Sequence, residues 1–389
     1  MHRTPRWVTT LSGVVVALLA LVIVVGLVFA RHLNPTRSAP SATCGSTAAS
    51  VPPRGAIKGM VTESLVRSAV NVGGLTVGSD GNIWMLASTT EMGSVSVILK
   101  ITTAGMFTDY PIPNQYPSVA GLTLGADGNL WFLESQGGAP VTTGARDVNQ
   151  SIVAEVSPSG RFSEYPLATS FMTPSAMTTG PDCNLWIADV GTNDVVRISN
   201  GTANRYQIPT PNSDPTAIVS GAEGNLWLAE SDAGRIARVT TSGNITEFPT
   251  PDGSEPWGIA SGPDGNLWVS ASQRMLPGGP GEVFKMTTSG AFTSYPIPSA
   301  KRLASQELLR DPRPGMITPG PDGNLWFIAL NNLDRITTSG VITQFLIPPL
   351  ANDTGSSLGS IVSGPADSIS YIGESTSSAR EQPMVGSLT

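Results

Sequence analysis

The stretch Gly262-Pro263-Asp264-Gly265-Asn266-Leu267-Trp268 decides the fold, because it recurs along the chain with small changes. Five other copies end in tryptophan, and a seventh, weaker copy ends in tyrosine. The aromatic residues of successive copies are 41 to 58 residues apart, which is the range of solenoids and propellers. The other copies are Ser79 to Trp84, Ala126 to Trp131, Pro181 to Trp186, Ala222 to Trp227, Pro321 to Trp326 and Pro365 to Tyr371.

Each unit contains two turn sequences, which together predict four short strands. Asp-Gly-Asn lies between apolar runs with strand-like alternation and therefore predicts a tight hairpin turn. A second turn follows in most units, as Thr240-Thr241-Ser242-Gly243 separates Arg235 to Val239 from Asn244 to Pro249. Four strands per unit without helical periodicity is the content of a propeller blade. The sequence therefore predicts an all-β, seven-bladed β-propeller of four-stranded blades.

The two ends of the chain predict how the ring closes. After Tyr371 the chain supplies one further strand, Met384 to Thr389, and no fourth one. The missing strand lies near the start, where Met60 to Leu65 aligns with Asn244 to Pro249. We expect this N-terminal strand to complete the last blade, because pairing the two ends removes the exposed edges of an open ring.

A long apolar segment precedes the repeats. Trp7 to Ala30 holds 24 uncharged residues, where about 20 are needed to span a bilayer as a helix. We expect residues 1–30 to be a transmembrane signal anchor. A cleaved signal peptide is the alternative, since Val28-Phe29-Ala30 is an acceptable cleavage site, although the run exceeds the usual length of about 7 to 15 residues. The first reading places the propeller outside the cell membrane on a single-pass anchor, and the second predicts secretion.

Residues 31–57 form a linker rich in Pro, Ser and Thr, and the propeller follows at residues 58–389. The linker cannot bury a core, so we expect a disordered tether. Cys44 lies in this linker and Cys183 in a blade turn. One cysteine pair is not a disulfide framework, and the sequence leaves open whether the two are paired or free.

The charge of the propeller excludes one class of partner. The chain has 22 basic and 29 acidic residues, and the first 58 residues hold six of the basic ones and no acid. The remainder carries 16 basic and 29 acidic residues, a net charge of −13. Nucleic acid is excluded as a partner, because its affinity depends on neutralising phosphates. Cationic, metal-bearing or neutral partners are favoured.

The longest loops all belong to one face of the predicted ring. Propeller strands alternate in direction, so the loops that enter each blade and those that join its second and third strands share a face, named here the long-loop face. The Asp-Gly-Asn and Thr-Ser-Gly turns share the opposite one, the turn face. Insertions on one face mark the binding side of repeat proteins, so we expect a monomer that binds a small molecule, glycan or protein there. The insertions are Ser88 to Val95, Ser135 to Gln150, Ser272 to Gly281 and Ser299 to Arg313.

Within the last insertion, Lys301 to Arg310 has leucines at helical spacing. This spacing predicts a short helix. It could act as a lid over the long-loop face or simply cover the end of a blade.

Acidic residues recur three positions after the blade aromatic residue and predict an acidic arc on the long-loop face. They are Glu134, Asp189, Glu230 and Glu374. Clustered carboxylates can bind a hard cation through oxygen; alternatively, each pairs with a neighbouring arginine or caps loop N–H groups. The aspartates of the Asp-Gly-Asn turns are expected to be structural, and the tryptophans to form the core between blades.

The unit seen in Arg235 to Pro249 and Glu255 to Trp268 resembles the repeat of the virginiamycin B lyase, or streptogramin lyase, family. The likeness covers residues 58 to 389. It implies a seven-bladed propeller and a metal-assisted elimination that opens cyclic streptogramin B antibiotics at their ester bond. The family chemistry implies a histidine entering the sixth blade, a Glu-x-His sequence entering the seventh, and magnesium.

This sequence departs from the family pattern at those positions. Gly315 stands in the place of the first histidine, and Ser357 and Gly359 replace the Glu and His of the seventh blade. The only histidines of the chain, His2 and His32, precede the propeller. Elimination needs a base at the departing proton, so no catalytic residue of the family can be carried over.

The sequence therefore favours a non-catalytic binding module without a cofactor. A Glu-Pro-x-Gly-Ile sequence does occur, as Glu255 to Ile259 in the fifth blade, with Trp257 in the histidine position. The alternative is a magnesium-assisted carbon–oxygen lyase that works with carboxylates alone or on a different cyclic ester. The predicted ligand-binding residues are Glu255, Trp257, Glu134, Asp189 and Glu230.

Overall fold

The computed structural model of the chain describes residues 61–65, 71–89, 95–113, 118–135, 151–167, 173–221, 223–273, 281–298, 314–329, 332–345, 347, 353–365, 367–377 and 380–389. All of them belong to one compact unit, Ser41–Thr389. The predicted anchor at 1–30, the linker at 31–57 and the helix at 301–310 lie outside the described residues. Within the described part, no helix is long and apolar enough to cross a membrane.

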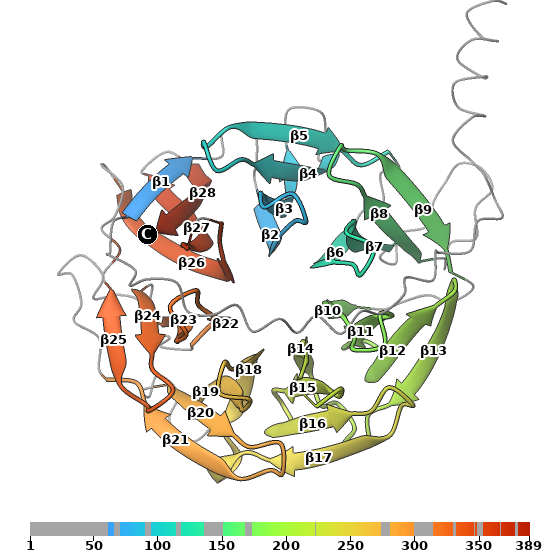
Figure 1. Ribbon diagram of the computed structural model, residues 1–389, viewed down its shortest axis with the longest axis vertical. Helices are drawn as coiled ribbons and strands as arrows, with labels where there is room; N and C mark the ends of the chain where they lie inside the picture. Colours follow the sequence, from blue (N-terminus) through green and yellow to red (C-terminus); the bar gives the residue numbers. More distant parts are fainter. Residues whose placement is uncertain are drawn as a thin grey trace, which may run out of the picture. The chain divides into compact units, whose positions relative to one another are not determined.

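The described residues form seven four-stranded antiparallel sheets, arranged as the blades of a ring (Figure 1). One short 3₁₀ turn, η1 (Pro251–Gly253), is the single helical element in these residues. The prediction of an all-β, seven-bladed propeller is confirmed.

Blades 1 to 3 each use four consecutive strands. Blade 1 contains β2 (Asn71–Val77), β3 (Ile83–Thr89), β4 (Val95–Ile101) and β5 (Phe107–Pro111). Blade 2 contains β6 (Ser118–Leu124), β7 (Leu130–Ser135), β8 (Ile152–Val156) and β9 (Phe162–Pro166). Blade 3 contains β10 (Pro174–Thr179), β11 (Leu185–Asp189), β12 (Asp194–Ser199) and β13 (Thr202–Gln207).

Blades 4 to 6 follow the same order. Blade 4 contains β14 (Pro215–Ser220), β15 (Leu226–Glu230), β16 (Arg235–Val239) and β17 (Ile245–Pro249). Blade 5 contains β18 (Glu255–Ser261), β19 (Leu267–Ser272), β20 (Glu282–Met286) and β21 (Phe292–Pro296). Blade 6 contains β22 (Ile317–Pro319), β23 (Leu325–Ala329), β24 (Asn332–Ile336) and β25 (Ile342–Phe345).

Blade 7 combines strands from both ends of the chain. It contains β26 (Asp353–Ser363), β27 (Ile369–Ser377), β28 (Arg380–Leu388) and, outermost, β1 (Val61–Leu65). The first and last residues of β1 lie opposite Leu388 and Met384 of β28, in an antiparallel register. Figure 1 shows β1 at the rim beside β28. That the stability of the ring depends on this strand stays a prediction.

The core of the propeller lies between the blades. The innermost strands contact one another in sequence from β2 through β6, β10, β14, β18 and β22 to β26, and β26 contacts β2 again. Trp84 of blade 1, for example, packs on Leu130 and Phe132 of blade 2. All six blade tryptophans and Tyr371 are buried. The tryptophans are therefore inter-blade core residues, as predicted.

In five of the seven blades, the aspartate of the first turn joins that turn to this core. In blade 5, Asp264 Oδ1 accepts a hydrogen bond from Trp268 Nε1 at 3.0 Å and another from the backbone N–H of Asn266 at 3.3 Å. Its second oxygen pairs with Lys285 Nζ at 2.7 Å. Gly262 is required before the turn, since a Cβ there would lie 2.4 Å from the indole. The same Asp–Trp hydrogen bond, at 2.9 to 3.1 Å, occurs with Asp80, Asp127, Asp182 and Asp322.

Among the six blades that contain the tryptophan, blade 4 is the exception and provides a natural comparison. Glu223 stands in the place of the aspartate, and its Oε1 accepts a hydrogen bond from Thr288 at 2.7 Å. The buried Trp227 Nε1 has no hydrogen-bond partner among the described residues. A side chain longer by one methylene therefore forgoes the bond to the indole.

We expect Glu223→Asp to stabilise the propeller and Asp264→Glu to destabilise it. A buried hydrogen bond contributes about 1 kcal/mol, and an unpaired buried donor costs about 1 to 3 kcal/mol. In a chain of this length each change should move the melting temperature by about 2 to 4 °C, in opposite directions. Thermal unfolding followed by circular dichroism measures both. A destabilised Glu223→Asp protein would contradict this account.

The role of β1 can be tested by truncation. A chain that begins at residue 67 should melt at least about 5 °C below one that begins at residue 58, because the shorter chain leaves β28 as an unpaired edge. Both chains lack the tether, so the comparison isolates the outer strand. Equal melting temperatures would mean that blade 7 does not depend on β1.

Candidate functional site

Glu255 and Trp257 lie together at the long-loop end of β18, the innermost strand of blade 5. The pairing of β18 with β19 shifts register between Pro256 and Gly258, so Trp257 is the extra residue of a β-bulge. A bulge re-aims its side chain. The half-buried indole donates a hydrogen bond from Nε1 to Ser272 Oγ at 3.2 Å, which holds it where the insertion of residues 272 to 281 begins.

Trp257 is the one large side chain among six equivalent bulges in the described strands. The hydroxyl of Thr216 donates to the Trp257 carbonyl at 3.1 Å, and the hydroxyl of Ser175 donates to the Pro215 carbonyl. These bonds join neighbouring blades at the same level. Around the ring the bulged residues are Gly74, Gly121, Ser175, Thr216, Trp257 and Gly359. Among the described strands, the bulged position is thus occupied by a small residue in every blade that has this bulge except blade 5.

A second carboxylate, not predicted from the sequence, lies near this end of blade 5. Glu282 is buried and accepts a hydrogen bond from Ser254 Oγ at 2.7 Å. Burial raises the pKa of Glu282, with Asp252 adding to the shift and the Ser254 bond opposing it. Glu282 is the first residue of β20 and directly follows the insertion of residues 272 to 281. This position beside an insertion of the long-loop face is the signal by which the sequence could have indicated Glu282.

The expected acidic arc needs correction, because its members are not exposed. Glu134, Asp189 and Glu230 are each 0 % exposed. Asp189 accepts hydrogen bonds from Thr173 N at 3.0 Å and Thr192 Oγ1 at 2.9 Å, and Arg205 lies 3.5 Å away. It therefore matches the structural alternative of an arginine pair and a loop cap.

Glu134 and Glu230 lie in two different inter-blade interfaces. Glu134 shares its face of β7 with Phe132, which packs on blade 1, and Glu230 shares its face of β15 with Leu228, which packs on blade 3. Alternation along each strand explains this placement. The structure therefore does not bring them together, and the side chain of Glu374 lies outside the described set.

Burial makes these carboxyl groups weak acids. It raises the pKa of Glu134 to about 8, and the charge of Glu164 adds to the effect. It likewise raises the pKa of Glu230 to about 8, with Glu247 adding to the shift and Arg235 opposing it. A third such acid, Asp334 on β24, has a pKa raised by burial to about 7.

The described residues contain no group of three or more His, Cys, Asp or Glu side chains that could hold a metal ion. The carboxylates are dispersed over separate interfaces. The chemistry available at the described long-loop end of blade 5 is therefore that of one indole with nearby carboxylates.

The buried glutamates predict a pH dependence of stability. Their pKa is higher in the folded chain than in the unfolded one, so their stabilising effect is complete below the ordinary glutamate pKa of 4.5 and is lost as pH rises toward 8. We expect the melting temperature to fall by roughly 5 °C or more between pH 5 and pH 8. Glu134→Gln and Glu230→Gln should each reduce that fall.

Asp367→Asn is the matched control, since Asp367 is exposed and its left-handed φ of 58° suits asparagine. It should leave the pH dependence unchanged. An identical pH profile for the unaltered chain and both glutamine variants would mean that the two glutamates are not protonated in the fold.

Comparison with known proteins agrees with the repeat and the ring. The model of the virginiamycin B lyase family matches residues 53–277 and 141–373. Comparison with curated protein sequences finds no significant relative. Among solved structures, virginiamycin B lyase from Staphylococcus aureus is 27% identical with a TM-score of 0.65, covering 85% of this chain and 99% of that one.

Two further structures show the same fold. A catalytically inactive histidine-to-alanine variant of the Staphylococcus aureus enzyme, with quinupristin, is 27% identical with a TM-score of 0.66, over 85% of this chain and 99% of that one. A streptogramin B lyase is 24% identical with a TM-score of 0.65, over 85% and 98% of the two chains. Because the family model matches well over half of the sequence, the chain belongs to the virginiamycin B lyase family.

Proposed function

We propose that this member of the family is an exported propeller, held at the cell membrane by residues 1–30, that binds a ligand on its long-loop face without catalysing an elimination. The observation that carries the proposal is the identity of two residues, one just before β22 and one within β26. Gly315 and Gly359 occupy the positions where the family resemblance implies histidines. No group that titrates near neutral pH is present at either position.

Packing does not force glycine at these positions. A Cβ on Gly315 would come no closer than 3.5 Å to its nearest neighbour, the Cβ of Ile328. A Cβ on Gly359 would come no closer than 3.9 Å, to the Ile372 carbonyl. Neither glycine has a positive φ. Both positions therefore accept a side chain, and the missing base is a chemical difference from the family rather than a steric one.

The buried acids do not replace the missing base. Glu134, Glu230 and Asp334 have raised pKa values, which at an exposed site would favour proton transfer. Each of them is 0 % exposed, so a substrate proton cannot come within hydrogen-bond distance. These groups act on stability.

Binding without elimination has support from a relative. The catalytically inactive histidine-to-alanine variant of the Staphylococcus aureus enzyme was crystallised with quinupristin. In that protein, the variant without this histidine is catalytically inactive and its structure contains quinupristin. The present chain lacks all of the family histidines by sequence.

The residues proposed to contact the ligand are Trp257 and Glu255. An indole offers a broad apolar surface with one polar edge, and aromatic residues of this kind dominate recognition surfaces. A nearby carboxylate and the net charge of −13 favour a neutral or cationic ligand over an anionic one. The ligand class is therefore an apolar, neutral or cationic molecule, such as a cyclic peptide or a side chain of a protein partner.

Family membership favours one second candidate, a magnesium-assisted carbon–oxygen lyase acting on a cyclic ester. The described residues do not fit a magnesium ion, because the carboxylates near blade 5 are too few to hold a hard cation through protein oxygens. No step through magnesium is therefore derived.

The purified protein is expected to leave a streptogramin B antibiotic cyclic in the presence of magnesium, because losing a positioned base costs a factor of about 10² to 10⁴. Liquid chromatography with mass spectrometry separates the cyclic and linear forms. Ring opening that needs magnesium, survives dialysis and vanishes with Glu255→Gln would establish the lyase and refute the binding module.

The binding half of the proposal has its own test, with immobilised protein and quinupristin as the probe. Trp257→Ala should weaken binding by about tenfold or more, whereas Trp257→Phe should retain most of it. Phe107→Ala, on the turn face, is the control and should bind like the unaltered chain. If both Trp257 variants bind quinupristin as tightly as the unaltered chain, the indole of Trp257 does not contact the ligand.

A further inference from the structure

Blades 1 to 6 each contain a pair of aromatic rings, one from the second strand and one from the fourth. The ring of the buried tryptophan lies beside that of a tyrosine or phenylalanine, with centroids 5.0 to 5.9 Å apart. In blades 1, 3, 4, 5 and 6 the tryptophan belongs to a core cluster shared with the next blade. A ring pair therefore fills the space between neighbouring blades. The pairs are Trp84–Tyr110, Trp131–Tyr165, Trp186–Tyr206, Trp227–Phe248, Trp268–Tyr295 and Trp326–Phe345.

Blade 7 has a serine at the tryptophan position. The first turn of every blade is closed by a hydrogen bond from its glycine N–H to a carbonyl two residues before that position. In blade 7 this carbonyl belongs to Ser368, so the equivalent of the tryptophan is Ser370. Ser370 lies opposite Ser387, in the register that pairs Trp268 with Lys285. The alignment of the seventh copy by its tyrosine is therefore wrong by one residue.

The second ring is missing from blade 7 as well, because the sequence of its outer strand, β1, contains no aromatic residue. The second-turn glycine of blade 1 records the difference. An added Cβ at Gly105 would meet no atom within 4 Å. At the equivalent glycines of blades 2, 4, 5 and 6 an added Cβ would collide with the fourth-strand ring of the preceding blade. These contacts are Gly160 with Tyr110, Gly243 with Tyr206, Gly290 with Phe248 and Gly340 with Tyr295.

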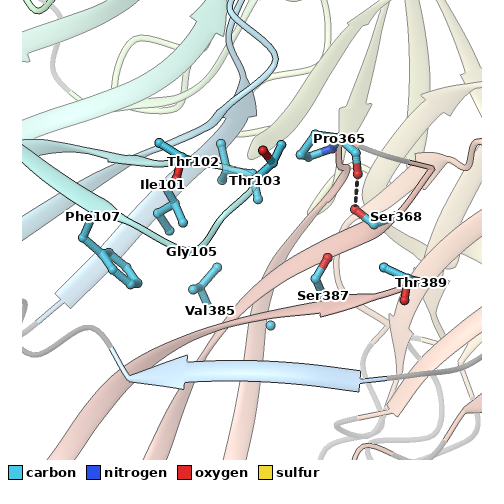
Figure 2. Close-up of a pocket in the computed structure, with 12 residues that line it drawn as sticks. Ile101, Thr102, Thr103, Gly105, Phe107, Pro365, Ser368, Val385, Ser387 and Thr389 are labelled. Atoms are coloured by element: carbon cyan, nitrogen blue, oxygen red, sulfur yellow. Dashed lines mark hydrogen bonds between the residues drawn. The ribbon is translucent and has the colours of Figure 1, made fainter.

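A cavity of about 200 Å³ lies between blades 7 and 1, where the two rings are missing (Figure 2). Ile83, which begins β3, and Ile101, which ends β4, form part of its wall. Their counterparts in blade 2, Leu130 and Val156, pack in one cluster with Trp84. The cavity thus keeps the walls that surround a ring elsewhere. Residues of turns line its mouth and place it on the turn face: Thr102, Thr103, Gly105, Pro365 and Ser368.

The exposure of Phe107 follows from the missing rings. Phe107 lines the cavity and is 37 % exposed. Residues at the same position in blades 2, 4, 5 and 6, where the preceding blade supplies its ring, are only partly exposed. They are Phe162, Ile245, Phe292 and Ile342. An apolar cavity with an accessible aromatic side chain at its edge is typical of a ligand site.

We propose that this cavity binds a small, neutral, planar aromatic molecule of about the size of indole. A ring is the shape that the equivalent interfaces enclose. A cavity of about 150 Å³ is enough to bind benzene, so this larger one has room for a two-ring molecule. Among the described residues that line it, none has a charged side chain, which favours a neutral ligand. The inference is independent of the proposed function, which concerns the opposite face.

Ser368 supplies a hydrogen-bond acceptor at the cavity. Its side chain is buried, and its hydroxyl donates to the Pro365 carbonyl at 2.6 Å (Figure 2). The Ser368 oxygen has thereby used its one proton and can only accept from a ligand. In blade 5 the indole N–H of Trp268 likewise donates to a side-chain oxygen of the first turn, that of Asp264. An N–H at the ring edge, as in indole, therefore matches this site.

Isothermal titration calorimetry of the full-length chain with indole tests the proposal. The expected dissociation constant is about 1 mM or lower. Ser370→Trp restores the ring of the other blades and should weaken indole binding by at least about tenfold, because the new side chain occupies the cavity. Trp227, whose Nε1 has no hydrogen-bond partner among the described residues, shows that blade 4 accommodates an indole without the aspartate bond. Circular dichroism checks that the variant folds.

Ser387→Phe is a second blocking variant, since it introduces a ring into the cavity from a half-buried position. Ser289→Phe makes the same change on an exposed turn of blade 5 and is the matched control, which should bind indole like the unaltered chain. Quinupristin, a cyclic peptide, is too large for this cavity, so the two probes test the two faces separately.

Three results would overturn the assignment. The first is no binding of indole by the unaltered chain up to the solubility limit. The second is undiminished indole binding in both blocking variants with unchanged circular dichroism spectra. The third is tighter binding of N-acetyltryptophanamide than of indole, which would assign the cavity to a tryptophan side chain of a protein partner.

Discussion

The hydrogen bond from a buried indole to a turn aspartate is the interaction on which the ring depends. Each carboxylate shapes its own turn, accepts from the tryptophan, and in four blades also pairs with a lysine or arginine of the third strand. The turn, the inner hairpin and the inter-blade core are thus joined at one group. Burying an indole N–H would otherwise cost free energy. Blade 4, with Glu223, shows that the fold survives the loss of this bond in one of the six blades that contain the tryptophan.

Much of the fold could be predicted from the sequence, because its determinants are local and repeated. Asp264, Gly265 and Asn266 specify a turn within four residues, and Trp268 follows at a fixed distance. The same logic could have predicted the burial of Glu134. Side chains alternate along a strand, so Glu134 shares a face with Phe132, and both faces of an inner blade strand are covered by neighbouring blades. The prediction of an exposed acidic arc did not take into account that a neighbouring blade covers the second face of each inner strand.

The candidate site was less predictable, since it depends on contacts between blades. Trp257 could be selected by its departure from the family pattern, but its place in a bulge among five small residues depends on the pairing of β18 with β19. Glu282 and Asp334 were missed because neither stands at a repeated distance from a tryptophan. The large indole of Trp257 among small residues is the feature on which the proposed recognition surface rests. An indole presents shape, whereas the family histidines would present a titratable nitrogen.

The pairing of β1 with β28 also has a consequence for biosynthesis. The strand that is made first finds its partner only when nearly the last residue of the chain has been made, so blade 7 cannot assemble while the chain emerges. Contacts of such long sequence separation form slowly. Blades 1 to 6 each consist of consecutive strands and can form in order during synthesis. The ring then remains open as an incomplete arc, and its final step is the meeting of the two chain ends.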